Sequence, residues 1–145
     1  MWVKPRLEEM GLGTTVPVTS GSKGMQLYAV LPGKHSADDI RALAQDLAQE
    51  MTKKHPDLVV WKMTKSLRPG KIFVDWSQNT AAKTTICPYS LRGKAAPYVA
   101  APRTWDEVEQ GAGGGRFGQL LMTEVLERLD DLGDLASALA GKRKR

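Results

Sequence analysis

Residues 14–31 read TTVPVTSGSKGMQLYAVL, a stretch of two runs typical of strands joined by a short polar segment. β-Branched residues dominate its first part, Thr14 to Thr19, and a second apolar run, Met25 to Leu31, is followed by a Pro-Gly pair. Both runs are typical of strands, and Pro17 places the first at an edge or a bulge. The segment between them, Ser20 to Gly24, is rich in the glycine and serine that form turns. The stretch therefore predicts a β-hairpin.

Helical signals follow the hairpin and return near the end of the chain. Ser36 with Asp39 three residues later resembles a capping box. Apolar residues then recur at helical spacing at Ile40, Leu43, Leu47 and Met51, before Pro56. A second capping box, Thr104 to Glu107, predicts another helix. A short helix is predicted to end over Leu7 to Leu12, where Gly11 and Gly13 are stop signals, and further helices are predicted over Thr123 to Leu132 and over Leu135 to Leu139.

The remaining strands are short. They are predicted over Leu58 to Trp61, Lys71 to Trp76 and Thr84 to Cys87, with none after Pro102. Strands and helices do not alternate regularly, so the order indicates an α+β fold, a mixed or antiparallel sheet with packed helices, and not a doubly wound sheet. The glycine-rich segment 111–115 predicts a flexible loop. It suggests a division into residues 1–110 and a helical tail, 111–145, with a basic end.

Composition narrows the class of protein. The chain has 145 residues, 41% of them hydrophobic, which suits one globular domain and argues against disorder. No apolar run is long enough to span a bilayer, and the first ten residues are too charged for a signal peptide. A single cysteine, Cys87, excludes an internal disulfide and a cysteine-based zinc cluster. We expect a cytoplasmic protein with no membrane partner.

Charge is distributed unevenly along the chain. Residues 53–94 carry nine basic and two acidic side chains, whereas residues 104–134 carry eight acidic side chains and two arginines. The basic segment suggests a surface that faces a polyanion. A solvated face with scattered lysines is the alternative on charge alone.

Two loops combine polar side chains with glycine. In Ser20 to Gly24, two glycines let the backbone approach an anion, two hydroxyls donate hydrogen bonds and Lys23 adds charge. The spacing is not that of a Walker loop, and a hairpin turn with an exposed lysine is the alternative. Near Tyr89, Arg92 precedes a glycine and is able to bind a phosphate with two parallel hydrogen bonds; as an isolated arginine it fits a surface position equally well. We expect Cys87 to pack inside a strand, and we assign His35 and His55 no role.

A carboxylate, Asp75, ends the strand predicted over Lys71 to Trp76. Strand alternation places Ile72, Val74 and Trp76 on one face and leaves Asp75 on the other. A carboxylate there needs a compensating cation, either a metal such as magnesium or a neighbouring lysine or arginine. Gln78 and Asn79 follow it and are typical of a turn.

Taken together, these segments resemble the polymerase domain of the bacterial ATP-dependent DNA ligase D family, within the archaeo-eukaryotic primase superfamily. The matching motifs are Val18 to Gly24, Met63 to Asn79, Lys83 to Thr85, Pro88 to Gly93 and Ala100 to Trp105. They cover about residues 7–110 and keep their order along the chain.

The resemblance implies specific roles. The loop containing Ser20 and Lys23 would hold the triphosphate of an incoming nucleotide, and Arg68 and Arg92 would contact the same phosphates. Asp75 would be the third metal-binding carboxylate, for Mg²⁺ or Mn²⁺, and Gln78 would lie near the nucleotide sugar. The implied reaction is nucleotidyl transfer at DNA ends during non-homologous end joining.

The chain departs from the family pattern in two respects. Gln26 stands where the family has a histidine, and glutamine donates a hydrogen bond to a phosphate but carries no charge. The chain also contains no Asp-x-Asp pair, which supplies the other metal-binding carboxylates of the family. It therefore resembles the carboxy-terminal half of the domain.

These departures leave two hypotheses for the function. The first is a split or truncated primase-polymerase, inactive alone, that binds nucleoside triphosphate and primer-template. Its implied partners are a separate amino-terminal half-domain, a ligase and a Ku-type end-binding protein. The second is a non-catalytic module, or relic, that binds DNA ends or nucleotides within a repair complex.

Overall fold

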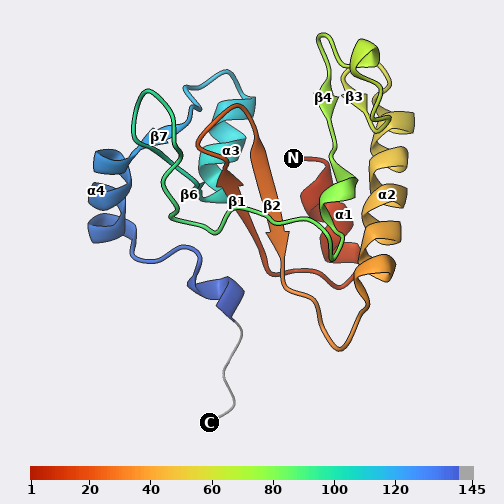
Figure 1. The fold of residues 1–145 in the computed structure, drawn as a ribbon, viewed down its shortest axis with the longest axis horizontal. Helices are drawn as coiled ribbons and strands as arrows, with labels where there is room; N and C mark the ends of the chain where they lie inside the picture. Colours follow the sequence, from red (N-terminus) through yellow and green to blue (C-terminus); the bar gives the residue numbers. More distant parts are fainter. Residues whose placement is uncertain (141–145) are drawn as a thin grey trace. The chain divides into compact units, whose positions relative to one another are not determined.

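The computed structural model describes residues 1–140 and contains short helices and small sheets (Figure 1). The chain divides into two compact units, the first formed by Val3–Pro32 with the residues from Ile86 onward, the second by Gly33–Thr85 with Trp2. The first unit contains α1 (Val3–Glu9), β1 (Thr15–Thr19), β2 (Met25–Ala29), β5 (Tyr98–Val99), β6 (Ala101–Pro102), α3 (Trp105–Ala112), β7 (Leu120–Leu121), α4 (Met122–Leu132) and a 3₁₀ turn, η3 (Ser137–Ala140). The second contains α2 (Ala37–Lys54), β3 (Val59–Val60), η1 (Lys65–Leu67), β4 (Ile72–Phe73) and η2 (Trp76–Gln78). The mixed α+β class predicted from the sequence is confirmed.

The predicted hairpin is the centre of the first unit. β1 and β2 pair antiparallel with Val18 opposite Gln26, and β6 joins the other edge of β1 to give the order β2-β1-β6. Val16 and Val18 are buried with Ala100, and Tyr28, Ile86 and Leu139 pack against them. The hairpin therefore holds the loop Ser20–Gly24 at the end of a buried strand.

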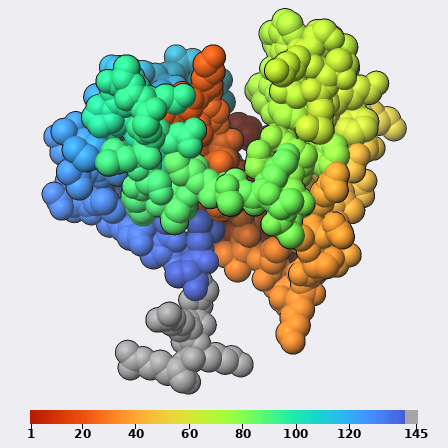
Figure 2. Space-filling view, in the orientation of Figure 1, coloured from red at the N-terminus to blue at the C-terminus, as the bar shows by residue number. Residues whose placement is uncertain are grey.

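The segment up to residue 140 packs on the same unit. β7 pairs antiparallel with β5, and Val125 of α4 is buried against Val99 and Ala101. In Figure 2 this blue segment lies directly against the green segment around residues 86–100. Because β7 is present, the expectation that no strand follows Pro102 is wrong. Leu120 and Leu121 form a strand because β5, which is distant in sequence, supplies its hydrogen-bonding partner.

The strand predicted over Thr84 to Cys87 does not form. This segment has no ladder partner, and Tyr28 anchors it instead by donating a hydrogen bond to the Ile86 carbonyl oxygen over 2.6 Å. Cys87 is exposed, so the expectation that it packs inside a strand is wrong. The β-branched residues of this segment favour a strand, but no neighbouring strand within residues 1–140 is placed to pair with it.

In the second unit, the long helix has the predicted start. The Ser36 hydroxyl accepts a hydrogen bond from the Asp39 N–H over 3.1 Å, and the Asp39 carboxylate accepts one from the Ser36 N–H over 3.1 Å. Leu47 and Met51 are buried on the apolar face of α2. The predicted capping box is therefore present.

β4 is shorter than its sequence predicts. It pairs in parallel with β3 and ends at Phe73, after which the chain turns into the 3₁₀ segment η2. Ile72 is 66% exposed whereas Trp76 is 9% exposed, so the two do not share a face as strand alternation predicted. The physical reason is that the backbone leaves the extended conformation at Asp75, and the Trp76 indole N–H then donates to the Trp61 carbonyl oxygen over 3.0 Å.

Three other α-helices lie close to their predicted places, but the helix predicted over Leu135 to Leu139 is only the 3₁₀ turn η3. α1 ends as predicted before Gly11, which has φ +79°. α3 has the predicted capping box at Thr104 and continues to Ala112, so the flexible loop begins later than predicted. Within residues 1–140, none of the helices is both long enough and apolar enough to cross a bilayer.

Candidate functional site

The predicted site residues fall into two groups, one in each compact unit. The first unit holds Ser20, Lys23, Gln26 and Arg92, and the second holds Arg68, Asp75 and Gln78. Each group is described by itself below.

The loop Ser20–Gly24 is closed by its own backbone. The Ser20 N–H donates to the Gly24 carbonyl oxygen over 2.9 Å, and the Ser20 hydroxyl oxygen accepts from the N–H groups of Ser22 and Gly24, each over 3.2 Å. Lys23 is exposed at the tip and makes no hydrogen bond or ion pair to any residue that the structure describes. The loop therefore presents an ammonium group that is available to an anion.

Arg92 lies against this loop although it is 72 positions beyond Ser20. Gly21 has φ +68°, and a Cβ atom there would lie 2.4 Å from Arg92 Cγ and 3.0 Å from the Val99 carbonyl group. Only glycine allows this approach, because a side chain would be strained in its backbone and would collide with Arg92. The fold thus brings the loop and the arginine into contact.

Gln26 is close to the loop in sequence and lies on β2. It is half-buried, and its Oε1 accepts a hydrogen bond from the Tyr28 hydroxyl over 3.4 Å. Its amide nitrogen is the group left to donate to an anion.

Asp75 caps the 3₁₀ turn of the second unit. Its Oδ1 accepts from the Ser77 N–H over 3.1 Å and from the Ser77 hydroxyl over 2.7 Å, and its Oδ2 accepts from Gln78 Nε2 over 3.2 Å. Lys83 Nζ donates to the Ser77 hydroxyl oxygen over 2.7 Å. Asp75 itself is exposed, so it remains reachable while its neighbours fix its orientation.

The carboxylates that the structure describes do not form a complete metal centre. Within residues 1–140, no group of three or more His, Cys, Asp or Glu side chains is placed to hold a metal ion. Asp75 offers one carboxylate, whereas a two-metal site needs several. A metal at Asp75 would therefore need further ligands from outside the described residues.

Arg68 is held by contacts within the second unit. Its guanidinium lies 3.8 Å from the centroid of the Phe73 ring and donates to the Met63 carbonyl oxygen. Its Nε is buried and has no hydrogen-bond partner within residues 1–140. Stacking on an aromatic ring fixes the plane of the guanidinium, which suits it to phosphate recognition.

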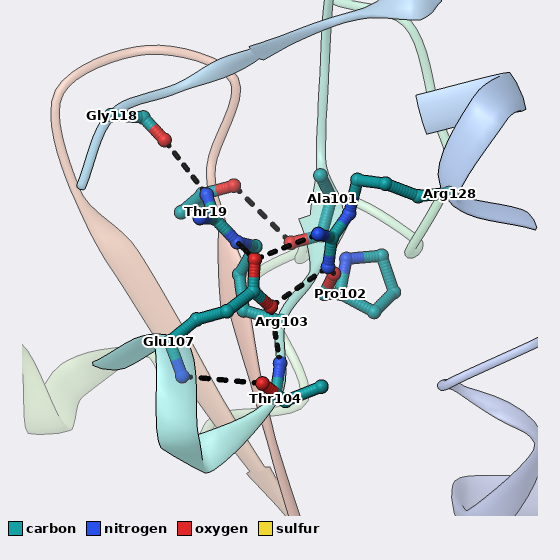
Figure 3. Close-up of polar contacts among 8 residues, drawn as sticks. All are labelled: Thr19, Ala101, Pro102, Arg103, Thr104, Glu107, Gly118 and Arg128. Carbon is teal, nitrogen blue, oxygen red and sulfur yellow. Dashed lines mark hydrogen bonds and ion pairs between the residues drawn. The ribbon is translucent and has the colours of Figure 1, made fainter. Parts of the chain in front are cut away.

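An ionic cluster of one buried arginine and two half-buried partners supports the first unit (Figure 3). Glu107 of α3 accepts hydrogen bonds from Arg103 Nε over 3.1 Å and from Arg128 of α4 over 2.7 and 2.8 Å. Arg103 also donates to the Gly118 carbonyl oxygen over 2.9 Å. Burial raises the pKa of Glu107, but hydrogen bonds from Arg128 and the Thr104 N–H, with the charges of Arg103 and Arg128, together lower it below its usual value. The cluster therefore links the end of β6, α3, α4 and the backbone at Gly118.

Sequence reasoning assigned no role to several residues of these groups. Ser77 and Lys83 lie within or beside the quoted motifs, and a serine two residues after an aspartate is a local signal for the turn that forms. Phe73 beside Arg68 and Gln119 beside the loop had no comparable local signal.

A comparison with protein families gives a match that covers most of the chain. The family described as LigD, primase-polymerase domain, matches residues 1–136. The chain belongs to the LigD primase-polymerase domain family. The resemblance inferred from the motifs is therefore confirmed.

Relatives within the family are named for end joining. The multifunctional non-homologous end joining protein LigD of Mycolicibacterium smegmatis is 53% identical over 125 residues, 86% of this chain and 16% of that protein. The LigD DNA repair protein of Mycobacterium tuberculosis strain H37Rv is 50% identical over 137 residues, 94% of this chain and 17% of that protein. The chain thus spans less than a fifth of the length of these relatives.

A solved structure has the same fold. The polymerase domain of Mycobacterium tuberculosis ligase D in complex with DNA is 49% identical, with a TM-score of 0.89 over 97% of this chain and 47% of that one.

Proposed function

We propose that this chain supplies the triphosphate-binding part of a primase-polymerase that acts on DNA ends during non-homologous end joining. The observation that carries the proposal is the contact of the loop Ser20–Gly24 with Arg92, through Gly21. Lys23 is exposed in this loop and Arg92 lies against it, so two cationic side chains belong to one part of the first unit. Two cations beside a glycine-containing loop are suited to a polyphosphate.

Each site residue has a proposed role in this function. Ser20, Lys23, Gln26 and Arg92 would donate to phosphate oxygens, as would Arg68, and Gln78 would lie near the nucleotide sugar. Charge-assisted hydrogen bonds contribute about 1.5–3 kcal/mol each. Several of them would give a triphosphate a measurable affinity.

Primase-polymerases of this family are metal-dependent nucleotidyltransferases, and we propose Mg²⁺ or Mn²⁺ as the metal. Asp75 is the candidate ligand in this chain, and Ser77 and Gln78 orient it. A single carboxylate does not complete a two-metal site, so we propose that this chain alone carries out no catalytic step. Further carboxylates would come from a separate amino-terminal half-domain.

The partners of this function are also proposals. The solved polymerase domain of Mycobacterium tuberculosis ligase D is in complex with DNA. We propose that the basic residues between 53 and 94 of this chain bind a DNA backbone at an end or primer-template junction. A ligase and a Ku-type end-binding protein are the proposed protein partners, in the bacterial cytoplasm at the nucleoid. A non-catalytic nucleotide- and DNA-binding module is the alternative, favoured by the absence of a metal-binding cluster in residues 1–140.

Triphosphate binding tests the first part of the proposal. Arg92→Ala should weaken the binding of ATP about 10- to 100-fold, because one charge-assisted hydrogen-bonding group is lost. Arg6→Ala is the matched control, because it removes the same charge from an exposed helical ion pair with Glu9. Equal affinities of the two variants, measured by isothermal titration calorimetry, would contradict a role for Arg92.

Primer extension distinguishes the enzyme from the non-catalytic module. The purified chain with Mg²⁺ or Mn²⁺ and all nucleotides should not extend a primer, since Asp75 alone does not hold two metal ions. Extension that appears when a partner with an Asp-x-Asp pair is added, and that is lost in Asp75→Ala, would support the split enzyme. Primer extension by the chain alone would contradict the prediction that the chain is inactive without a partner. No extension in either assay would favour the non-catalytic module.

A further inference from the structure

A glutamine outside every motif contacts the proposed triphosphate loop. Gln119 Nε2 donates a hydrogen bond to the Gly24 carbonyl oxygen over 3.1 Å, across 95 positions of sequence. The same oxygen accepts the Ser20 N–H that closes the loop. Both lone pairs of the Gly24 carbonyl are therefore used, one by the loop itself and one by Gln119.

The orientation of this amide is set by its surroundings. Gln119 Oε1 is buried and has no hydrogen-bond partner among the described residues. Turning the amide over would leave the nitrogen in that position and would point Oε1 at the Gly24 oxygen, so that two acceptors faced each other. A buried acceptor without a partner is uncommon. Here the unpartnered Oε1 belongs to the same amide whose nitrogen donates to the Gly24 oxygen of the loop.

The backbone on both sides of Gln119 is fixed. The preceding residue, Gly118, accepts a hydrogen bond from Arg103, whose side chain is 6% exposed and is held by Glu107 (Figure 3). The following residue, Leu120, pairs with Val99 in the ladder of β5 and β7. Gln119 thus reaches the loop from a rigid base.

The loop is consequently held at two points. Gly21 lies against Arg92 and Val99 near its start, and Gln119 binds Gly24 at its end. Lys23, between these points, is exposed. A loop that is already ordered loses less conformational entropy when it binds an anion.

We infer that Gln119 is a positioning residue for the triphosphate loop, acting through the Gly24 carbonyl to hold Ser20–Gly24 in the conformation that presents Lys23. This inference rests on the proposed function for its role in binding, whereas its effect on the loop does not depend on any ligand.

Two variants separate the hydrogen bond from packing. Gln119→Leu removes the donor, and Gln119→Glu keeps the size of the side chain but replaces the donor by a carboxylate oxygen. Gln49→Leu is the control, because Gln49 is an exposed glutamine of α2. The readouts are amide hydrogen exchange at Ser20 and Val18, followed by nuclear magnetic resonance, and the dissociation constant of ATP.

We expect exchange at Ser20 to be about tenfold faster in both Gln119 variants, since local opening of the loop becomes easier, while exchange at Val18 in the adjoining strand changes less than about twofold. The affinity for ATP should fall about fivefold, through the lost ordering of the loop. Gln49→Leu should change neither quantity.

Unchanged exchange at Ser20 would overturn the inference, and so would equal acceleration at Ser20 and Val18, which indicates a general loss of stability. Unchanged ATP affinity in both variants of a chain that binds ATP would overturn the role in binding. If the wild-type chain itself does not bind ATP, the proposed function fails, and exchange at Ser20 still decides whether Gln119 holds the loop.

Discussion

The loop Ser20–Gly24 of the first unit and the turn Asp75–Gln78 of the second use the same local chemistry but are held in different ways. In each, a side-chain oxygen accepts a backbone N–H two residues later, on Ser20 and on Asp75. The partners of the turn, Ser77, Gln78 and Lys83, all lie within eight residues of Asp75. The loop depends instead on Arg92 and Gln119, which are far away in sequence.

This difference has a physical consequence. A turn that is held by local hydrogen bonds needs only its own few residues to form. A loop that is held by distant residues forms only when the elements carrying those residues have packed. We therefore expect the loop to be sensitive to changes elsewhere in the first unit, and the turn to be sensitive only to its own residues.

The largest effect should come from the cluster that supports the loop from a distance. Glu107→Ala leaves Arg103 and Arg128 without their shared carboxylate, and the joint loss of several charge-assisted hydrogen bonds in a half-buried cluster should cost about 3 kcal/mol. Glu109→Ala, at an exposed position of the same helix, should change the free energy of unfolding by less than about 0.5 kcal/mol. Urea unfolding measures both, and similar values would contradict a supporting role for the cluster.

The same carboxylate predicts how stability depends on pH. The pKa of Glu107 is lowered in the folded protein, so its stabilisation is fully present above the unfolded pKa of about 4.3 and is lost as the pH falls through the folded pKa. Urea midpoints measured between neutral pH and pH 3 should fall less steeply in Glu107→Gln than in the wild type. A parallel decrease in the two proteins would show that Glu107 does not contribute to this dependence.

A smaller effect is expected within the loop. Gly21→Ala should lower the free energy of unfolding by about 2 kcal/mol, because the new methyl group would meet Arg92 and the Val99 backbone at a positive φ. Gly24→Ala is the matched control, since no atom lies within 4 Å of its added Cβ, and it should change stability by less than about 0.5 kcal/mol. Equal costs for the two alanines, in thermal unfolding, would show that the contact between the loop and Arg92 is not tight.

The smallest effect is expected in the turn. Ser77→Ala removes the hydroxyl that links Asp75 to Lys83 and should cost about 1 kcal/mol, the value of one hydrogen bond. Amide exchange should accelerate at residues 76–79 and remain unchanged in β1. Ser66→Ala, at an exposed position, is the control. Acceleration that spreads to β1 would contradict the local character of the turn.

Much of the fold followed from signals that act over a few residues. Ser36 and Thr104 begin helices because their side chains reach the backbone three residues later, and Ser20–Gly24 forms a turn because serine and glycine favour one. The expected strand at Thr84 to Cys87 was wrong because propensity does not supply a neighbouring strand. The expected alternation from Ile72 to Trp76 was wrong because the chain turns at Asp75.

Local signals predicted the hairpin and the capped helices, and the motifs predicted the family and the candidate residues Ser20, Lys23, Arg68, Asp75 and Arg92. The contacts of Gly21 with Arg92 and of Gln119 with Gly24 depend on the packing of distant elements. The pairing of β7 with β5 was decided in the same way. These contacts join residues whose separation in sequence carries no local signal, so they exist only once strands and helices have packed.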